Sequence, residues 1–189
     1  MLRALTMRSL AAMAMVAGLT AARGDEYAID QAHAAFDFRI QHLGLSWTSG
    51  RFGAVEGSFR IDPDPAKSAF TVSIKTDSID SGNKQRDDHL RSPDWFDAKQ
   101  HPTITFKSTA VKKVEKGYEV TGDFTLHGVT KPITMVLEGG GEAEFPKGVK
   151  RTGYTGTTSI KRSDYGMKGM VGPIGDEVQL WVSFEGIKK

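Results

Sequence analysis

Apolar and polar side chains alternate strictly in the run Phe36-Asp37-Phe38-Arg39-Ile40-Gln41. A period of two is typical of a β-strand with one dry face and one wet face. The same alternation recurs at residues 58–62, 70–75, 103–107, 118–126, 132–137 and 180–184, and turn signals rich in Gly, Pro and Asp separate these segments. The sequence therefore predicts an all-β protein of about eight antiparallel strands, either a sandwich or a small barrel.

One segment, residues 81–100, is charged and does not alternate. Residues 84–91 predict a short helix. Ser92-Pro93-Asp94 predicts the start of a second one, with Ser as N-cap and Pro at the first helical position. Trp95 and Phe96 would be the buried residues of this second helix. The β-structure is thus expected to carry one short helical excursion around residues 84–97.

Charged side chains in this excursion have two interpretations. Arg86, Asp87 and Arg91 either pin the helix to the barrel, which we favour, or touch the headgroup of a ligand. The adjacent acids Asp87 and Asp88 are expected to form a solvated face.

The amino terminus predicts the compartment. Arg3 and Arg8 precede a short apolar stretch at residues 10–22, and small residues at 22–24 suit a signal peptidase. This pattern indicates a cleaved secretory signal peptide at residues 1–24 and a single mature domain at residues 25–189. The apolar stretch is too short for a transmembrane helix, and a lipoprotein anchor would need a cysteine, which the chain lacks. We expect a periplasmic protein without a disulfide framework.

The charge balance argues against a nucleic-acid partner. The whole chain has 25 basic and 23 acidic side chains, and removal of the predicted signal peptide takes away arginines but no acid. The mature domain would be close to neutral, whereas nucleic-acid binding requires a clustered basic face. An outer-membrane barrel would also alternate, but its lipid-facing runs would be unusually short here and the 81–100 segment is highly charged.

Short signatures follow one another in a distinctive order along the mature chain. They are Asp30-Gln31-Ala32-His33, His42-x-Gly44, Gly57-x-Phe59, Arg86-Asp87-x-His89-Leu90, Trp95-Phe96-Asp97, Pro102-x-Ile104-x-Phe106, Gly122-x-Phe124-x-Leu126-x-Gly128 and Arg162-x-x-Tyr165-Gly166. In this order the chain resembles the YceI family of bacterial periplasmic proteins. The resemblance implies an extended, eight-stranded lipocalin-like antiparallel barrel around an elongated apolar tunnel. It further implies binding of a polyisoprenoid, such as a prenyl quinone or its precursor, and a link to stress responses.

The inward-facing apolar residues of the predicted strands would line such a tunnel. They are Phe36, Phe38, Ile40, Phe59, Ile61, Phe70, Val72, Ile74, Phe106, Phe124, Leu126, Met135, Leu137, Leu180, Val182 and Phe184. The alternative is that the same residues fill a solid core.

The tunnel mouth is expected to involve Arg86, Trp95, Phe96, Met167 and Met170. The two methionines lie in a glycine-rich segment, residues 166–175, which predicts a mobile flap because glycine frees the backbone and methionine is an adaptable apolar surface. An ordinary long hairpin loop is the alternative.

Catalysis and metal binding find little support. The five histidines, His33, His42, His89, His101 and His127, lack the short spacing of a helical metal site and are expected to fix turns. There is no cysteine nucleophile and no Gly-x-Ser-x-Gly motif. The sequence therefore favours a binding protein with no metal, no cofactor and a bound isoprenoid amphiphile as ligand, compatible with transient membrane contact and with a homodimer. The alternative class is an enzyme or metal-dependent protein that uses polar groups inside the barrel.

Overall fold

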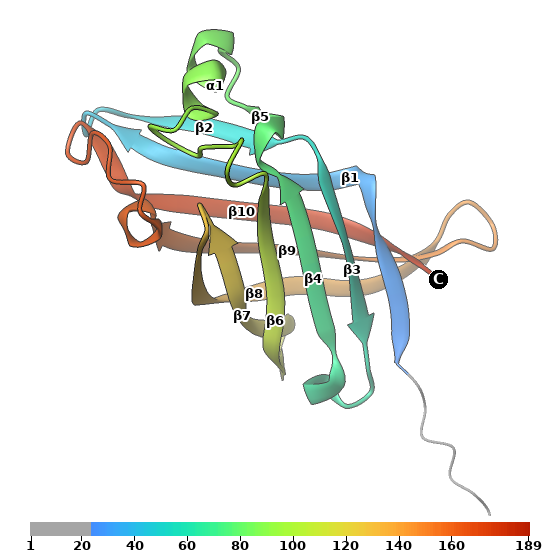
Figure 1. The fold of residues 1–189 in the computed structure, drawn as a ribbon. Helices are drawn as coiled ribbons and strands as arrows, with labels where there is room; N and C mark the ends of the chain where they lie inside the picture. Colours follow the sequence, from blue (N-terminus) through green and yellow to red (C-terminus); the bar gives the residue numbers. More distant parts are fainter. Residues whose placement is uncertain (1–23) are drawn as a thin grey trace, which may run out of the picture.

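The computed structural model describes residues 24–189, which form a barrel of β-strands with one short α-helix beside its rim (Figure 1). The strands are β1 (Asp25–His42), β2 (Ser46–Phe52), β3 (Val55–Ile61), β4 (Ala69–Lys75), β5 (Ile79–Asp80), β6 (Thr103–Val114), β7 (Gly117–Leu126), β8 (Val129–Glu144), β9 (Lys150–Lys161) and β10 (Ile174–Lys188). The α-helix is α1 (Lys84–Leu90), and the 3-10 helices are η1 (Pro65–Lys67), η2 (Thr76–Ser78) and η3 (Arg162–Tyr165). The predicted signal peptide lies outside the described residues, except for Gly24.

Eight strands close the barrel. They run in the order β10-β9-β8-β7-β6-β4-β3-β1, every pairing is antiparallel, and β1 pairs with β10 to close the wall. The short strands β2 and β5 extend the sheet beside the second half of β1. The predicted all-β, eight-stranded antiparallel barrel is confirmed, and the sandwich alternative is excluded. No helix within residues 24–189 is both long and apolar enough to cross a bilayer.

Strand β1 pairs with two different strands along one of its edges. Its start pairs with β3, with Tyr27 opposite Phe59, and its end pairs with β2, with Phe38 opposite Gly50. Between these halves the register with β10 shifts across residues 30–33. There the Asp30 carboxylate accepts a hydrogen bond from the Ala32 amide at 3.1 Å. The Asp-x-x-His signature is therefore the irregularity that lets one strand join two neighbours.

The predicted second helix is wrong. Helix α1 forms as expected, with the Asn83 side chain accepting from the Arg86 amide at 3.0 Å as an N-cap. Residues 91–102 instead form successive turns, in which the Phe96 amide donates to the Leu90 carbonyl at 3.0 Å. The Ser92 hydroxyl is buried and caps no helix, having no hydrogen-bond partner in the described part of the chain. Trp95 and Phe96 pack against the barrel from these turns and not from a second helix.

One end of the barrel interior is filled by an aromatic plug, which we define as Tyr27, Phe59, Phe70, Tyr118, Tyr154 and Phe184. Phe59 lies at its centre, with ring centroids 4.9 Å from Tyr27, 5.6 Å from Phe70 and 5.7 Å from Tyr154. Gly186 makes room, because a Cβ there would lie 2.3 Å from the Phe59 ring. Burial raises the pKa of Tyr154 to about 12, as expected for a phenol removed from water.

Candidate functional site

Beyond the aromatic plug the barrel interior is hollow. A cavity of about 680 Å³ lies between the strands, within the size range of small-molecule sites. Phe38, Ile40 and Leu180 face this space and remain only half-buried. Side chains in a filled core would be fully buried, so this part of the interior is a cavity and not a packed core.

Most of the predicted tunnel residues border this cavity. They are Phe36, Phe38, Ile40, Phe70, Val72, Ile74, Phe106, Phe124, Leu126, Met135, Leu137, Leu180, Val182 and Phe184. Phe59 and Ile61 do not: Phe59 lies at the centre of the plug, whose members Phe70 and Phe184 face the cavity, and Ile61 packs against the core at the same end. The space is therefore closed at the plug. Ile104, Ile133, Ile160 and Val178 also border it; their period-two spacing could have identified them.

Polar side chains gather at the open end of the cavity. They come from the end of β1, from β2 and from the segment around α1, and include Gln41, His42, Thr48, Asn83 and Gln85. Burial raises the pKa of the Asp37 carboxyl, which also borders the cavity, and the nearby Arg51 opposes this shift. The polar end faces solvent, whereas the floor is aromatic.

All of the predicted mouth residues border the cavity. Trp95 and Met167 are buried, Phe96 is half-buried, and Met170 is exposed. Arg86 borders the cavity from α1. The structure therefore brings the glycine-rich segment 166–175 and the helical excursion to the same opening, although they are far apart in sequence.

Hydrogen bonds hold α1 against the neighbouring β5. The Arg86 guanidinium donates to the Ser81 hydroxyl at 2.8 Å and to its carbonyl at 2.6 Å. Arg91 donates to the Ile79 carbonyl at 2.7 Å. Asp87 is buried and accepts from the Ser81 amide at 2.8 Å, which corrects the prediction that it lies on a solvated face. Arg86, Asp87 and Arg91 thus hold α1 to Ser81 and β5, which agrees with the favoured prediction that they pin the helix.

Arg162 is the main site residue that sequence analysis left without a role. Its side chain is 2% exposed, and it donates to the carbonyls of Met167 at 2.6 Å, Gly175 at 2.9 Å and Ile174 at 3.1 Å. Its guanidinium lies 5.2 Å from the centre of the Trp95 ring. Burial lowers the pKa of this guanidinium, and the Asp176 carboxylate opposes the shift. One buried cation thus ties both ends of the segment 166–175 to the wall of the cavity.

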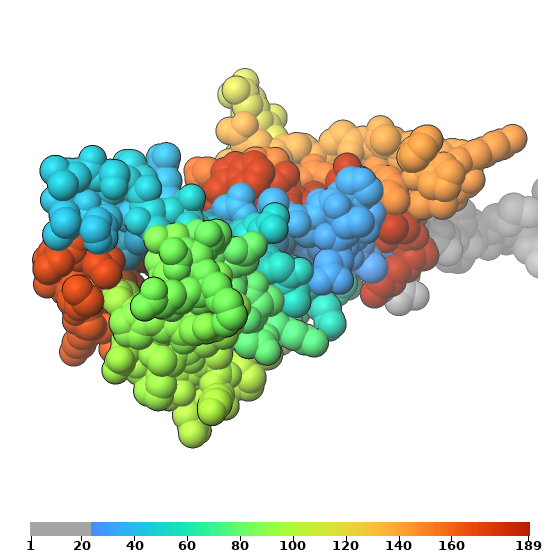
Figure 2. All heavy atoms as spheres, turned by 90° about the horizontal axis from the view of Figure 1, so that it is seen from above, coloured from blue at the N-terminus to red at the C-terminus, as the bar shows by residue number. Residues whose placement is uncertain are grey.

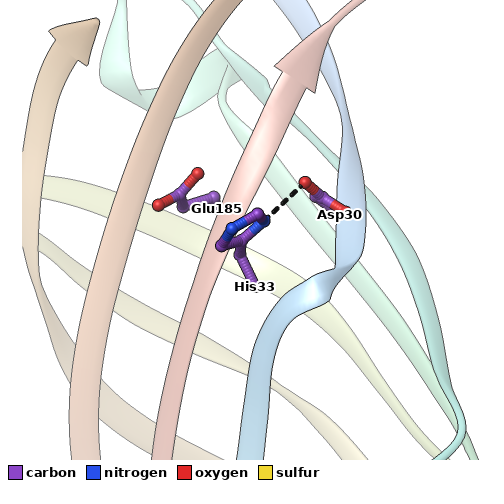
Figure 3. Close-up of side chains that lie close together, drawn as sticks. All are labelled: Asp30, His33 and Glu185. Carbon is purple, nitrogen blue, oxygen red and sulfur yellow. Dashed lines mark hydrogen bonds and ion pairs between the residues drawn. The ribbon is translucent and has the colours of Figure 1, made fainter. Parts of the chain in front are cut away.

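Asp30, His33 and Glu185 form a cluster away from the cavity, at the irregularity in β1 (Figure 3). Their ligand atoms lie within 4.8 Å of one another, and His33 Nδ1 is 2.8 Å from Asp30 Oδ2. The Arg151 guanidinium, however, lies 2.6 Å from Asp30 Oδ2 and 3.1 Å from Glu185 Oε2. Because an arginine already pairs with both carboxylates, this cluster is an ion-pair network joining β1, β9 and β10.

The network makes folding stability depend on acidic pH. Arg151 and His33 lower the pKa of the Asp30 carboxyl from 3.8 to about 2. Because the folded state favours the ionised carboxylate, this group stabilises the fold at pH values above its ordinary pKa of 3.8. The contribution disappears as the pH falls through 3.8 towards 2. We expect Asp30→Asn to be less stable than the unmodified protein at pH 6, and the gap to narrow as the pH falls from about 4 to 2. Urea unfolding at a series of pH values measures this; a gap that stays constant across the series contradicts it.

The histidines do not converge on one point within residues 24–189. His42 and His89 border the cavity, and His89 lies 3.4 Å from Asp94. The rings of His101 and His127 are 4.6 Å apart, and His127 Nδ1 is 3.2 Å from the Tyr165 carbonyl. His127 therefore holds the turn beside η3, in agreement with the expectation that histidines fix turns, and the His101 ring packs against it.

The chain is similar in sequence and in structure to known proteins. Residues 27–186 match the family described as the YceI-like domain. The protein YceI of an Escherichia coli strain is 42% identical over 167 residues, which cover 87% of each chain. The crystal structure of Burkholderia cenocepacia BcnA is similar with a TM-score of 0.76 and 25% identity, covering 83% of this chain and 98% of that one. A polyisoprenoid-binding domain from Saccharophagus degradans has a TM-score of 0.64 over 86% of this chain and 98% of that chain, and at 17% identity it shares the fold.

Proposed function

We propose that this chain, which belongs to the family of YceI-like domains, is an exported binding protein that holds an isoprenoid amphiphile in its cavity. The observation that carries the proposal is an apolar cavity closed by aromatic rings at one end and edged by polar side chains at the other. An apolar chain would fill the closed end, and its polar headgroup would remain at the opening.

The energetics suit a prenyl chain. Burial of each CH₂-sized group contributes ~0.8 kcal/mol, so a five-carbon isoprene unit contributes on the order of 3–4 kcal/mol. The similar fold of a domain described as polyisoprenoid-binding supports this ligand class. A prenyl quinone or its precursor is such a ligand, and a protein in the periplasm would carry it, store it or protect it under stress.

Binding explains the arrangement of polar groups better than catalysis does. An active site needs an acid, a base or a nucleophile converging on one reacting atom. Here the polar side chains are distributed around the opening, and Arg86 and Arg162 are engaged with backbone carbonyls of the fold. We therefore favour a carrier or reservoir over an enzyme.

Native mass spectrometry of the protein, purified from its own periplasm without detergent, tests the proposal. We expect a stoichiometric adduct that solvent extraction identifies as a prenyl lipid. The delipidated protein should then bind prenyl alcohols with an affinity that rises with each isoprene unit and stops rising when the chain reaches the plug. An unliganded mass, with no uptake on incubation with prenyl quinones, would sink the proposal.

A further inference from the structure

Five large apolar side chains are exposed at the end of the barrel where the cavity opens. Leu43, Leu45 and Trp47 belong to the hairpin between β1 and β2, and they are 56%, 83% and 43% exposed. Met170 and Val171 belong to the segment 166–175, and they are 58% and 48% exposed. We call these five residues the apolar rim.

The two halves of the rim form one surface. The Leu43 amide donates to the Pro173 carbonyl at 2.7 Å, which joins the hairpin to the segment 166–175. Figure 2 shows the two segments, in light blue and orange-red, against each other at one end of the molecule. The five rim side chains therefore lie on two adjoining segments at one end of the molecule.

The backbone at both tips indicates that these apolar residues are retained at a cost. Leu43 has φ 53° and Met170 has φ 51°, both in the left-handed region that disfavours bulky side chains. Glycine would be easier to accommodate at either position. A strained, exposed apolar residue contributes little to folding, and such outliers point to a function.

The two segments that carry the rim contain no acidic side chain. Residues 43–50 contain no charged side chain, and residues 166–175 contain only Lys168. The Arg39 guanidinium adds a positive charge 4.7 Å from the centre of the Trp47 ring. A quarter of the whole chain is charged, so two tips without an acid are a distinct feature. Apolar side chains with nearby cations fit the interface of an anionic lipid bilayer.

The rim is continuous with the cavity. Met170 is exposed on the rim and also borders the cavity. On the other half of the rim, His42 and Thr48 of the β1–β2 hairpin border the cavity too. A lipid that leaves the cavity through its opening therefore passes directly over the rim. A second protein copy would cover this opening, whereas a bilayer would receive the lipid.

We infer that the apolar rim is a docking surface for an anionic lipid bilayer, with Leu45 and Val171 inserted among the headgroups and Trp47 at the interface. This inference rests on the proposed function in one respect only: the proposed function gives the reason why the protein would dock. Docking itself needs no ligand in the cavity.

Vesicle flotation measures the docking directly. The probe is a vesicle of three parts phosphatidylethanolamine and one part phosphatidylglycerol, free of isoprenoids, compared with pure phosphatidylcholine. We expect the protein to float with the anionic vesicles, and Leu45→Ser with Val171→Ser to reduce the bound fraction at least fivefold. Neither residue borders the cavity, so the same variant should keep its isoprenoid adduct in native mass spectrometry.

The matched control is Val136→Ser with Phe145→Ser. These side chains are 42% and 74% exposed and lie on β8 and on the β8–β9 connection, away from the opening. This variant should float like the unmodified protein. The inference fails if the control loses as much binding as the rim variant, if the unmodified protein does not float, or if the rim mediates a dimer that Leu45→Ser dissolves. Absence of the isoprenoid adduct from the unmodified protein as well as from both variants, with flotation of the unmodified protein intact, would instead overturn the proposed function alone.

Discussion

Replacement of Leu180 by tryptophan is expected to weaken isoprenoid binding at least tenfold and to leave the free energy of unfolding nearly unchanged. Leu180 lies in β10, faces the cavity and is half-buried because empty space adjoins it. An indole can occupy this space without displacing packed neighbours, so it removes room for the ligand without overpacking the core. A tenfold loss corresponds to about 1.4 kcal/mol of binding free energy. Titration with a prenyl alcohol measures the affinity, and urea unfolding measures the stability.

The control for this experiment is Thr157→Trp. Thr157 pairs with Trp181 of β10 but is exposed on the outer face of the barrel. It receives the same indole without reaching the cavity, and its affinity should match that of the unmodified protein. If Leu180→Trp binds as well as Thr157→Trp, the ligand does not lie in the cavity. If Leu180→Trp unfolds at much lower urea, the region around it is packed and not hollow.

The strands that sequence analysis predicted are those with bulky apolar residues at every second position. Strand β9 was missed because its inward positions include Thr152, Gly156 and Thr158, which give no hydrophobic alternation. Its place in the barrel follows from its pairing with β8 and β10, which no local pattern reports. The sequence pattern thus predicts the class of the fold from residues that pack in the interior. It misses a strand whose inward positions include small or polar residues and which contributes mainly backbone hydrogen bonds.

The period-two pattern predicted which face of each strand is inward, but not how deep along the barrel each residue lies. Phe59 and Phe124 are equivalent in sequence, each in an alternating strand. Phe59 is in the plug and Phe124 borders the cavity, although β7 also contributes Tyr118 to the plug. The closed end depends on Gly186 and Tyr154, which are distant in sequence from Phe59 and from each other. Depth is a property of the pairing register, and it required the structure.

The role of Arg162 was equally inaccessible, since its partners are backbone carbonyls and carry no side-chain signature. We expect Arg162→Ala to lower the free energy of unfolding by about 3–5 kcal/mol, because three carbonyls lose a charged donor and those that stay buried are left unpaired. For a domain of this size the melting temperature would fall on the order of 10 °C. Arg162→Lys should recover only part of this loss, since an ammonium group lacks the planar fork that reaches several acceptors. Thermal and urea unfolding measure both variants.

The matched control is Arg51→Ala, which removes an exposed arginine 3.2 Å from Asp80 and should cost less than about 1 kcal/mol. Hydrogen exchange then separates the local effect from the global one. Because Arg162 ties both ends of the segment 166–175, its loss should accelerate exchange of the Ile174 amide, which donates to the Met170 carbonyl, more than exchange of amides in β7. An Arg162→Ala protein as stable as Arg51→Ala, or one with uniform acceleration across the barrel, would show that this arginine does not hold the edge of the cavity. A selective acceleration would make Arg162 the residue that holds the segment 166–175 beside Trp95 at the edge of the opening.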